Sequence, residues 1–562
     1  MTEKKASMKK KAPKIGEIKK TLTLGGIISA IAVVGIIVGI YFVSKSTQYG
    51  GVLYVCGYDL PYTIDPIDVS DIADVDTINQ VAEGLFDIGE NLEIVYCLAT
   101  DDEWSIDGFN LTCLLRQGVK FHDGTPFNAS AVKWNIDRAY RLIDNIPFDF
   151  LWLLPDGRPI INETIVLDEY TIKFILNTPY APLRSLLAST YSYIVSPTAT
   201  PANRFIDRFS ESLVGTGPFR FDFYAEDDNV TLSANTNYRD GRPLLDKLIF
   251  LKPTKSVEEA LKSGEIHLKK DVRFNEITLN YFRNNPSFTV SDPIPFLYRD
   301  IIIMNNKLIN VTMRKAISYA FNYSNYQLSF RYVRAKGPIP DGILYCNISG
   351  IDVPYYNISI ARQALKDVNW PGTETLTAND DISPGNPWEL VATSLTPLET
   401  YNYSACYNWE WSIEYADRIT EDLKQIGLKI EPVNLSLSQW LCIYYEWGNC
   451  SRDMFELAFD FWAADYNDPS NFINEFYTNK KKGYNAGQFN DTQIQEWMDA
   501  ALYEIDPNAR RLLYYIIQKS LLEDLFPSVF LNSWTRTDVY VSNLMGWNPH
   551  PFKDSFKNVY FK

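Results

Sequence analysis

The chain has 562 residues, of which 46% are hydrophobic and 22% charged, a globular composition with length for about three domains. Its formal net charge is −16, but residues 1–20 carry +6, so the rest of the chain stands at −22. Because contacts to phosphate need a basic face, this acidic body argues against a nucleic-acid partner.

The N-terminal region combines a basic stretch with an uncharged run of 22 residues from Leu22 to Val43. A helix needs about 20 apolar residues to cross a membrane, whereas the core of a cleaved signal is about 7–15 residues long. No small-residue cleavage pattern and no lipid-accepting Cys follows the run. We therefore predict a cytoplasmic tail (1–21), an uncleaved transmembrane helix (22–44) and a single-pass protein of the cell membrane whose main body is extracellular.

The triplet Asn-x-Ser/Thr recurs along the predicted extracellular body, which indicates a glycosylated surface. Together with the uncleaved anchor, this pattern favours an archaeal-type surface protein. The glycosylation candidates are Asn110, Asn128, Asn162, Asn229, Asn310, Asn322, Asn347, Asn357, Asn402, Asn434, Asn449 and Asn490.

All seven cysteines follow the predicted anchor, on the side where disulfides persist. Cys97 with Cys113 and Cys442 with Cys450 are close enough in sequence to close small loops. The odd count leaves at least one thiol unpaired, and spacing does not fix the connectivity. The alternative, that these are buried apolar thiols, stays open.

Short strands and amphipathic helices alternate along the body, which predicts an α/β fold. Residues 51–60 alternate and are rich in β-formers, so they predict a strand. Ser256 with Glu259 forms a capping box and Gly264 ends the helix that follows. Apolar residues at helical spacing over 413–426 predict a second helix, ended by Gly427 before a strand.

The usual signatures of catalysis are absent from the sequence. The three histidines stand apart, without the spacing of zinc ligands. Glu90 occupies the place of the phosphate-loop Lys, while Ser470 and Phe476 break a calcium-loop pattern at its Gly and its final Glu. We predict no cofactor, no metal and no catalytic residue, although a glycosidase carboxylate pair stays open.

Residues 105–139 contain "LRQGVKFHDGTPF", a turn with Asp, Gly and Pro that leads into a helix capped by Asn128 or Ser130. This segment resembles the signature of the extracytoplasmic solute-binding proteins of family 5, the peptide and nickel receptors of ABC importers. The match identifies a structural corner rather than a ligand site, so His122 is interpreted as structural.

Further blocks follow the order of the same family, among them "VGTGPFRF", "YRDGRPLLDKLIFLK" and "MRKAISYAFN". The resemblance implies a type II periplasmic-binding-protein fold, with two lobes joined by hinge strands and closing around a ligand. It implies lobe I at 45–95, 215–300 and 530–562, an inserted subdomain at 96–214, and lobe II at 301–529.

The segment "FWAADYNDPSNF" (461–472) is similar to the family segment in which an Asp after a Trp binds the α-ammonium of a peptide. The resemblance therefore implies Asp465 as the ligand contact and Trp462 as its aromatic neighbour. An acid among apolar groups needs a positive partner, which fits this role. The alternative is that Asp465 only shapes the turn, as we expect of Asp468 before Pro469.

Dipeptide-specific members also carry an Arg that clamps the ligand's carboxylate, but the corresponding stretch here, 391–409, has no Arg or Lys. A longer peptide therefore fits better. Tyr58 and Asp59 follow the first strand and are expected to face the cleft, with solvated surface as the alternative.

The sequence thus predicts a membrane-anchored extracellular receptor, not an enzyme, that captures oligopeptides and delivers them to the permease subunits of an ABC importer. A sugar or metal-chelate receptor on the same scaffold is the first alternative. An extracellular hydrolase such as a glycosidase and a structural surface glycoprotein are the alternatives from other classes.

Overall fold

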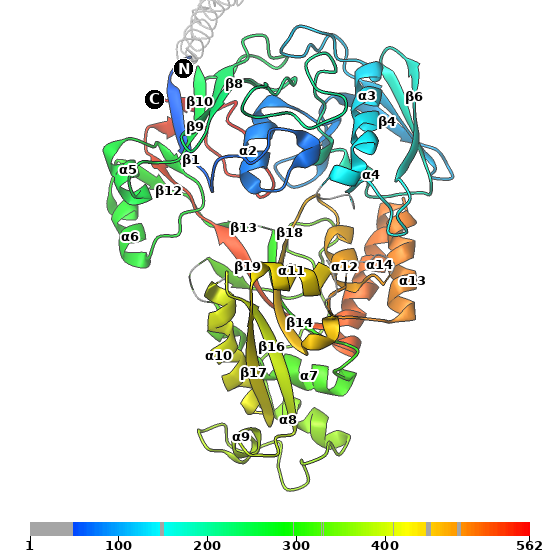
Figure 1. Cartoon of the computed structure of the whole chain (residues 1–562), viewed down its shortest axis with the longest axis vertical. Helices are drawn as coiled ribbons and strands as arrows, with labels where there is room; N and C mark the ends of the chain where they lie inside the picture. Colours follow the sequence, from blue (N-terminus) through cyan, green and yellow to red (C-terminus); the bar gives the residue numbers. More distant parts are fainter. Residues whose placement is uncertain are drawn as a thin grey trace, which may run out of the picture. The chain divides into compact units, whose positions relative to one another are not determined.

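The computed structural model describes residues 49–146, 151–295, 297–327, 329, 331–408, 410–445, 451–479 and 485–562. Two compact units are distinguished along the chain, Met1–Tyr49 and Gly50–Lys562, and every element below belongs to the second. That unit contains two seven-stranded mixed sheets, one in each of two lobes (Figure 1).

The lobe I sheet has the strand order β12-β20-β11-β1-β10-β9-β8. Strand β1 is parallel to both of its neighbours, whereas β8, β9 and β10 pair antiparallel. Its first strand confirms the prediction from residues 51–60. The bounds are β1 (Val52–Cys56), β8 (Phe219–Ala225), β9 (Asn229–Ala234), β10 (Lys247–Leu251), β11 (Leu268–Lys269), β12 (Phe288–Val290) and β20 (Val539–Val541).

The lobe II sheet runs β13-β19-β14-β18-β16-β17, with β15 on β19. In its centre β18 pairs antiparallel with β14 and parallel with β16. The bounds are β13 (Ile294–Pro295), β14 (Tyr298–Met304), β15 (Tyr332–Arg334), β16 (Glu399–Cys406), β17 (Leu428–Leu435), β18 (Leu457–Ala463) and β19 (Ser528–Arg536).

Smaller sheets belong to the part of the chain before β8 and to the C-terminal segment. A four-stranded antiparallel sheet has the order β4-β5-β7-β6, and two further pairs are β2-β3 and β21-β22. The bounds are β2 (Phe86–Ile88), β3 (Ile94–Tyr96), β4 (Ala99–Trp104), β5 (Asn110–Leu115), β6 (Ile161–Asp168), β7 (Thr171–Leu176), β21 (Leu544–Met545) and β22 (Tyr560–Phe561).

Helices cover both faces of the lobe II sheet, because its strands are apolar on both sides. One hydrophobic cluster joins the sheet to α7, α8 and α10, and the other joins it to α11, α12, α13 and α14. The bounds are α2 (Ile72–Val81), α3 (Ala129–Arg141), α4 (Leu183–Leu186), α5 (Val257–Ser263), α6 (Glu276–Asn284), α7 (Val311–Ala320), α8 (Ile358–Asp367), α9 (Pro387–Ala392), α10 (Glu410–Lys424), α11 (Leu437–Tyr445), α12 (Ser470–Tyr477), α13 (Thr492–Tyr503) and α14 (Pro507–Ser520).

Local signals placed several of these elements correctly. The hydroxyl of Ser256 accepts the N–H of Glu259 at 3.3 Å and caps α5, which ends at Gly264 with φ of +76°. Gly427, at φ +79°, separates α10 from β17 in the same way. Asn128, rather than Ser130, caps α3 by accepting the N–H of Ala131 at 3.0 Å.

Two adjacent chain crossings join the lobes. The chain passes from β12 to β13 and β14, and it returns from β19 to β20. Strands β13 and β19 pair antiparallel at the crossing, Ile294 with Arg536 and Pro295 with Thr535. Chain crossings between two lobes are where a hinge can form, and a hinge at this place stays a prediction. The residue boundaries given above for lobes and subdomain stay predictions.

The predicted single-pass membrane location is contradicted and is withdrawn. None of the helices described within Tyr49–Lys562 is long and apolar enough to cross a membrane. Helix α10, for example, has 15 residues and so extends about 22 Å, against an apolar thickness of about 30 Å. The segment 22–44, on which the prediction rested, lies outside the described residues.

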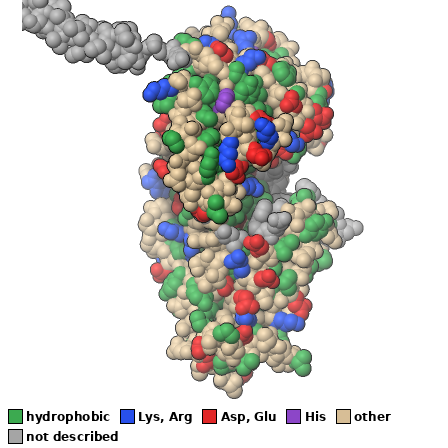
Figure 2. Space-filling model, turned by 90° about the vertical axis from the view of Figure 1, so that its left-hand side faces the viewer, with side chains coloured by type: hydrophobic (Ala, Val, Ile, Leu, Met, Phe, Trp, Pro, Cys, Tyr) green, Lys and Arg blue, Asp and Glu red, His purple; other side chains and the backbone are tan. Residues whose placement is uncertain are grey.

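Charges of both signs are mixed on one face of the protein. On the face shown in Figure 2, Lys and Arg side chains lie among Asp and Glu side chains and do not gather into one basic patch. This face offers no continuous track for a phosphate backbone.

Candidate functional site

Three adjoining cavities lie where lobe I meets lobe II, and we call them together the cleft. Their volumes are about 90, 340 and 630 Å³, and Ile72 and Tyr298 line all three. Ile72 opens α2 in lobe I, and Tyr298 opens β14 in lobe II. The two larger cavities are of the size that holds small ligands.

Asp465 lies on the lobe II side of the cleft, just past the C-terminal end of β18. Ala463 is paired with Tyr298, so the last residue of β18 lies beside the first residue of β14, at the end of the strands that faces lobe I. Asp465 lines the 90 and 340 Å³ cavities, and Trp462 lines the latter. The structure thus brings these two predicted residues together.

Only neutral donors contact the Asp465 carboxylate among the described residues. Asn471, in α12, donates from its amide to Oδ2 at 2.9 Å, and its own oxygen accepts the N–H of Asp465 at 2.8 Å. The hydroxyl of Tyr191, from lobe I, donates to Oδ1 at 3.2 Å. Burial raises the pKa of Asp465 to about 6, although both hydrogen bonds oppose this rise. The carboxylate is held in place without a countercharge.

Asp468 takes a different partner, which the sequence did not reveal. Its carboxylate forms a bidentate ion pair with Arg510 of α14, with Nη2 at 2.8 Å from Oδ1, and both side chains are buried. It also accepts the N–H and hydroxyl of Ser470 at 3.0 and 2.7 Å, at the start of α12. Asp468 therefore shapes the turn, as expected, and also forms a buried ion pair.

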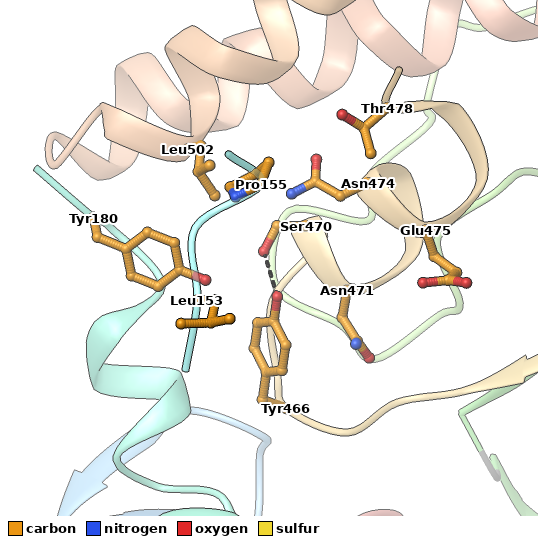
Figure 3. Close-up of a pocket in the computed structure, with 10 residues that line it drawn as sticks. All are labelled: Leu153, Pro155, Tyr180, Tyr466, Ser470, Asn471, Asn474, Glu475, Thr478 and Leu502. Atoms are coloured by element: carbon orange, nitrogen blue, oxygen red, sulfur yellow. Dashed lines mark hydrogen bonds between the residues drawn. The ribbon is translucent and has the colours of Figure 1, made fainter. Parts of the chain in front are cut away.

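A small cavity behind this segment is too small for a ligand. Figure 3 shows it between Tyr180 of lobe I and the first turns of α12, with the Tyr466 hydroxyl 2.9 Å from that of Ser470. Its volume is about 30 Å³, which corresponds to about one water molecule. Of the cavities described here, those of the cleft are therefore the larger candidates for a ligand site.

Aromatic rings form much of the cleft wall. Tyr298 stacks on Trp534 with ring centroids 4.9 Å apart and planes 8° apart, and on Phe461 at 5.9 Å and 21°. Trp462 makes an edge contact with Phe476 at 6.5 Å. Rings packed in this way present rigid apolar surface that can stack on a ligand.

Tyr58 and Asp59 line the 630 Å³ cavity, as their predicted position beside the cleft requires. Two cationic residues of lobe I, Lys269 and Arg273, line the same cavity. Burial lowers the pKa of Lys269, whose ammonium lies over the Tyr58 ring at 5.7 Å and donates to the carbonyl of Gly57. This part of the cleft therefore carries positive as well as negative groups.

Asp460 is a cleft residue that the sequence analysis missed. It lies in β18 and lines the 340 Å³ cavity with Trp462, while the residue as a whole is only 6% exposed. An acid between Phe459 and Phe461 in an otherwise apolar strand was the available signal. Burial raises its pKa to about 8.

Direct contacts join the lobes beside the cleft. Arg331, just before β15, pairs with Asp271 of lobe I through Nη2, which lies 2.6 Å from both carboxylate oxygens. The hydroxyl of Ser185 donates to the carbonyl of Asn467 at 2.9 Å. Together with the Tyr191 hydrogen bond, these contacts connect the two lobes directly.

The candidate disulfide between Cys97 and Cys113 is not formed: both thiols are free and buried, as the alternative of buried apolar thiols has it. Across the β4–β5 pair Cys113 faces Asp102, so Cys97, which precedes β4, lies out of reach. Cys442 is disulfide-bonded, and Cys450 lies outside the described residues. His122 is structural as interpreted: its Nε2 lies 2.9 Å from the carbonyl of Gly217, and burial lowers its pKa to about 4.

The candidate glycosylation sites that the structure describes are all at least partly exposed, and Asn449 lies outside the described residues. Glycosylation and the archaeal-type surface stay predictions. In the described part of the chain, no group of three or more His, Cys, Asp or Glu residues could hold a metal ion.

Comparisons with known proteins agree with this architecture. The family model of the bacterial extracellular solute-binding proteins, family 5 middle, matches residues 93–484. The glutathione-binding protein GsiB of Pectobacterium atrosepticum is 28% identical over 332 residues, which cover 56% of this chain and 60% of that protein. GsiB of Salmonella typhi is 25% identical over 463 residues, 80% of this chain and 83% of that one.

Among solved structures, the ABC transporter-associated periplasmic binding protein DppA of Helicobacter pylori, in complex with the peptide STSA, shares this fold. The TM-score is 0.68 at 23% identity, over 92% of this chain and 99% of that one.

Proposed function

The chain belongs to the extracellular solute-binding proteins of family 5, and we propose that it captures peptides in the cleft and delivers them to an ABC importer. The observation that carries this proposal is Asp465, an oriented cleft carboxylate whose contacts among the described residues are all neutral. A charged partner from the ligand would supply the missing countercharge, in a bond of about 1.5–3 kcal/mol.

In the proposed complex the peptide's α-ammonium binds Asp465, and Trp462 and the other rings contact the chain that follows. Lobe closure brings Tyr191 onto the same carboxylate, which couples ligand capture to the hinge. The known relatives include a protein in complex with a peptide and proteins named for glutathione, itself a short peptide, so a peptide-type ligand fits the family.

The ligand's carboxylate end is assigned to lobe I. No Arg or Lys is present in 391–409, where a dipeptide clamp was expected. Lys269 and Arg273 line the 630 Å³ cavity, which adjoins the Asp465 end through Ile72, Asp71 and Tyr298. A peptide running from Asp465 towards these cations would be longer than a dipeptide, which supports an oligopeptide ligand. Tyr58 and Asp59 would then contact its C-terminal part.

Native mass spectrometry of the full-length protein as purified tests the proposal. We expect co-purified peptides of several residues and a rise in melting temperature with added tri- to pentapeptides. Nickel chelates and oligosaccharides serve as comparison ligands. Stabilisation by one of these and by no peptide would contradict the proposal, and release of hydrolysed products would favour the enzyme alternative.

A further inference from the structure

Asp460 is a buried carboxyl with almost no partner. Its Oδ1 accepts the N–H of the next residue, Phe461, at 2.8 Å, and this is its only hydrogen bond within the described parts of the chain. No Lys, Arg or His among those residues lies within ion-pair distance. A carboxylate this deeply buried is unfavourable unless a cation joins it.

Other buried carboxyls show how the same chain treats acids in its interior. Asp468 and Asp538 are each ion-paired with an Arg, at 2.8 Å or less. Asp422 forms no ion pair among the described residues but receives the N–H of Asn322 at 2.9 Å and the hydroxyl of Tyr326 at 2.8 Å. Asp460 has neither arrangement, and it lines a cavity.

The surroundings of Asp460 suit a long cationic side chain. The 340 Å³ cavity is walled by Trp440, Phe461 and Trp462. Indole and phenyl faces attract cations, and they also pack against the methylene groups of Lys or Arg. A carboxyl at one wall with aromatic rings around it is a pocket for one positive charge on an apolar stem.

We propose that Asp460 selects peptides with a basic side chain near the N-terminus, by pairing with that side chain while Asp465 holds the α-ammonium. This rests on the proposed peptide function. Both acids line the 340 Å³ cavity and are five residues apart, so their Cα atoms are no more than about 17 Å apart. With 3.8 Å between successive Cα atoms, a long side chain on one of the first three ligand residues reaches Asp460.

The ionisation of Asp460 gives the proposal a second readout. Because burial raises its pKa to about 8, the carboxyl of the empty cleft holds its proton at pH 7. A bound cation favours the ionised form and lowers this pKa, so a Lys peptide displaces a proton that an uncharged peptide leaves in place.

Calorimetric titration of the full-length protein with pentaalanine derivatives tests this selectivity. Each peptide carries Lys or norleucine at position 1, 2 or 3, so that charge is the main difference between the pair. We expect the Lys peptide to bind about tenfold more tightly than the norleucine peptide at one position in the wild type. The matched control Asp417→Asn, which removes an exposed acid of α10 in the same lobe, should show the same ratio. Asp460→Asn should abolish this ratio, because it removes the charge that pairs with the Lys side chain.

Equal affinities for Lys and norleucine at all three positions, or an unchanged tenfold ratio in Asp460→Asn, would overturn the inference while the norleucine peptides still bind. If no peptide of either series binds, the proposed function itself fails. Should Asp460→Asn not fold, the wild type alone decides: titration at pH 7.5 in buffers of different ionisation enthalpy should show more proton release with the Lys peptide, and equal release would overturn the inference.

Discussion

Asp465 and Asp468 are three residues apart in one turn, yet the protein treats them in opposite ways. Asp468 is buried between α12 and α14, where its carboxylate pairs with Arg510. Asp465 faces the cleft and is held only by the neutral groups of Asn471 and Tyr191 among the described residues. The difference shows that an acid can be oriented by the fold and still be left for a cation from outside.

Near the hinge, lobe I contains a larger group of buried acids that are paired with buried cations, as Asp468 is paired with Arg510. Near the hinge Lys270 pairs with Asp76 and with Asp554, the latter at 2.6 Å, and Arg536 pairs with Asp554 at 2.9 Å and with Asp538 at 2.7 Å. All these side chains are buried. The buried Lys and Arg side chains therefore pair with acids inside the fold. Asp460 and Asp465, on the cleft wall, have no cationic partner among the described residues.

The largest effect is expected from breaking the internal pair. Arg510→Leu leaves the Asp468 carboxylate buried and unpaired, so we expect the free energy of unfolding to fall by about 3–5 kcal/mol in urea titration. The double variant Arg510→Leu/Asp468→Asn keeps a capping oxygen for Ser470 and should lose less. A single variant within about 1 kcal/mol of wild type would show that the pair does not stabilise the fold.

Removing the cleft charge should affect binding instead. Asp465→Asn retains the shape of the side chain but removes the partner of the α-ammonium, so peptide affinity should fall about 10–100-fold by calorimetry. The free energy of unfolding without ligand should not fall, because no described cation loses its partner. Unchanged affinity would make Asp465 a turn residue only.

Acidification should weaken peptide binding through the same group. The pKa of Asp465 in the empty cleft is about 6, so its carboxyl becomes protonated below that pH, while an α-ammonium stays charged. Affinity for an uncharged-side-chain peptide should fall by up to about tenfold from pH 7 to pH 5. In Asp465→Asn the profile over this range should be flat, and a parallel fall in that variant would assign the effect to another group.

The last prediction concerns the stability of the empty cleft. An unfolded Asp ionises near pH 3.9, but folded Asp460 keeps its proton to about pH 8, so stability is lost as the pH rises between these values. Asp460→Asn should therefore unfold with a free energy about 1 kcal/mol or more above wild type at pH 8.5, and with little difference at pH 4. A variant less stable than wild type at pH 8.5 would show that the ionised carboxyl has an internal partner.

Local sequence signals predicted much of the frame. Caps and stops such as Ser256 and Gly427 act within a few residues, so the helices they bound could be assigned directly. The family resemblance supplied the two lobes and the place of Asp465, since its neighbours Trp462 and Pro469 lie in the same segment.

Partners far apart in sequence could not be predicted in this way. Arg510 lies 42 residues from Asp468, and Tyr191 lies 274 residues from Asp465. Neither pairing leaves a local pattern, because tertiary packing alone brings the groups together. Asp460 was overlooked for a related reason. The sequence shows an acid within a strand, but it does not show that the fold buries this acid without a Lys or Arg partner among the described residues.

One thermodynamic cycle tests most directly the claim that the carboxylate of Asp465 binds the ligand's α-ammonium. A pentapeptide and its N-acetylated twin are titrated into wild type and Asp465→Asn. The account predicts that acetylation weakens binding at least tenfold in wild type and has little further effect in the variant. Equal affinities of the two peptides for the wild type would contradict it.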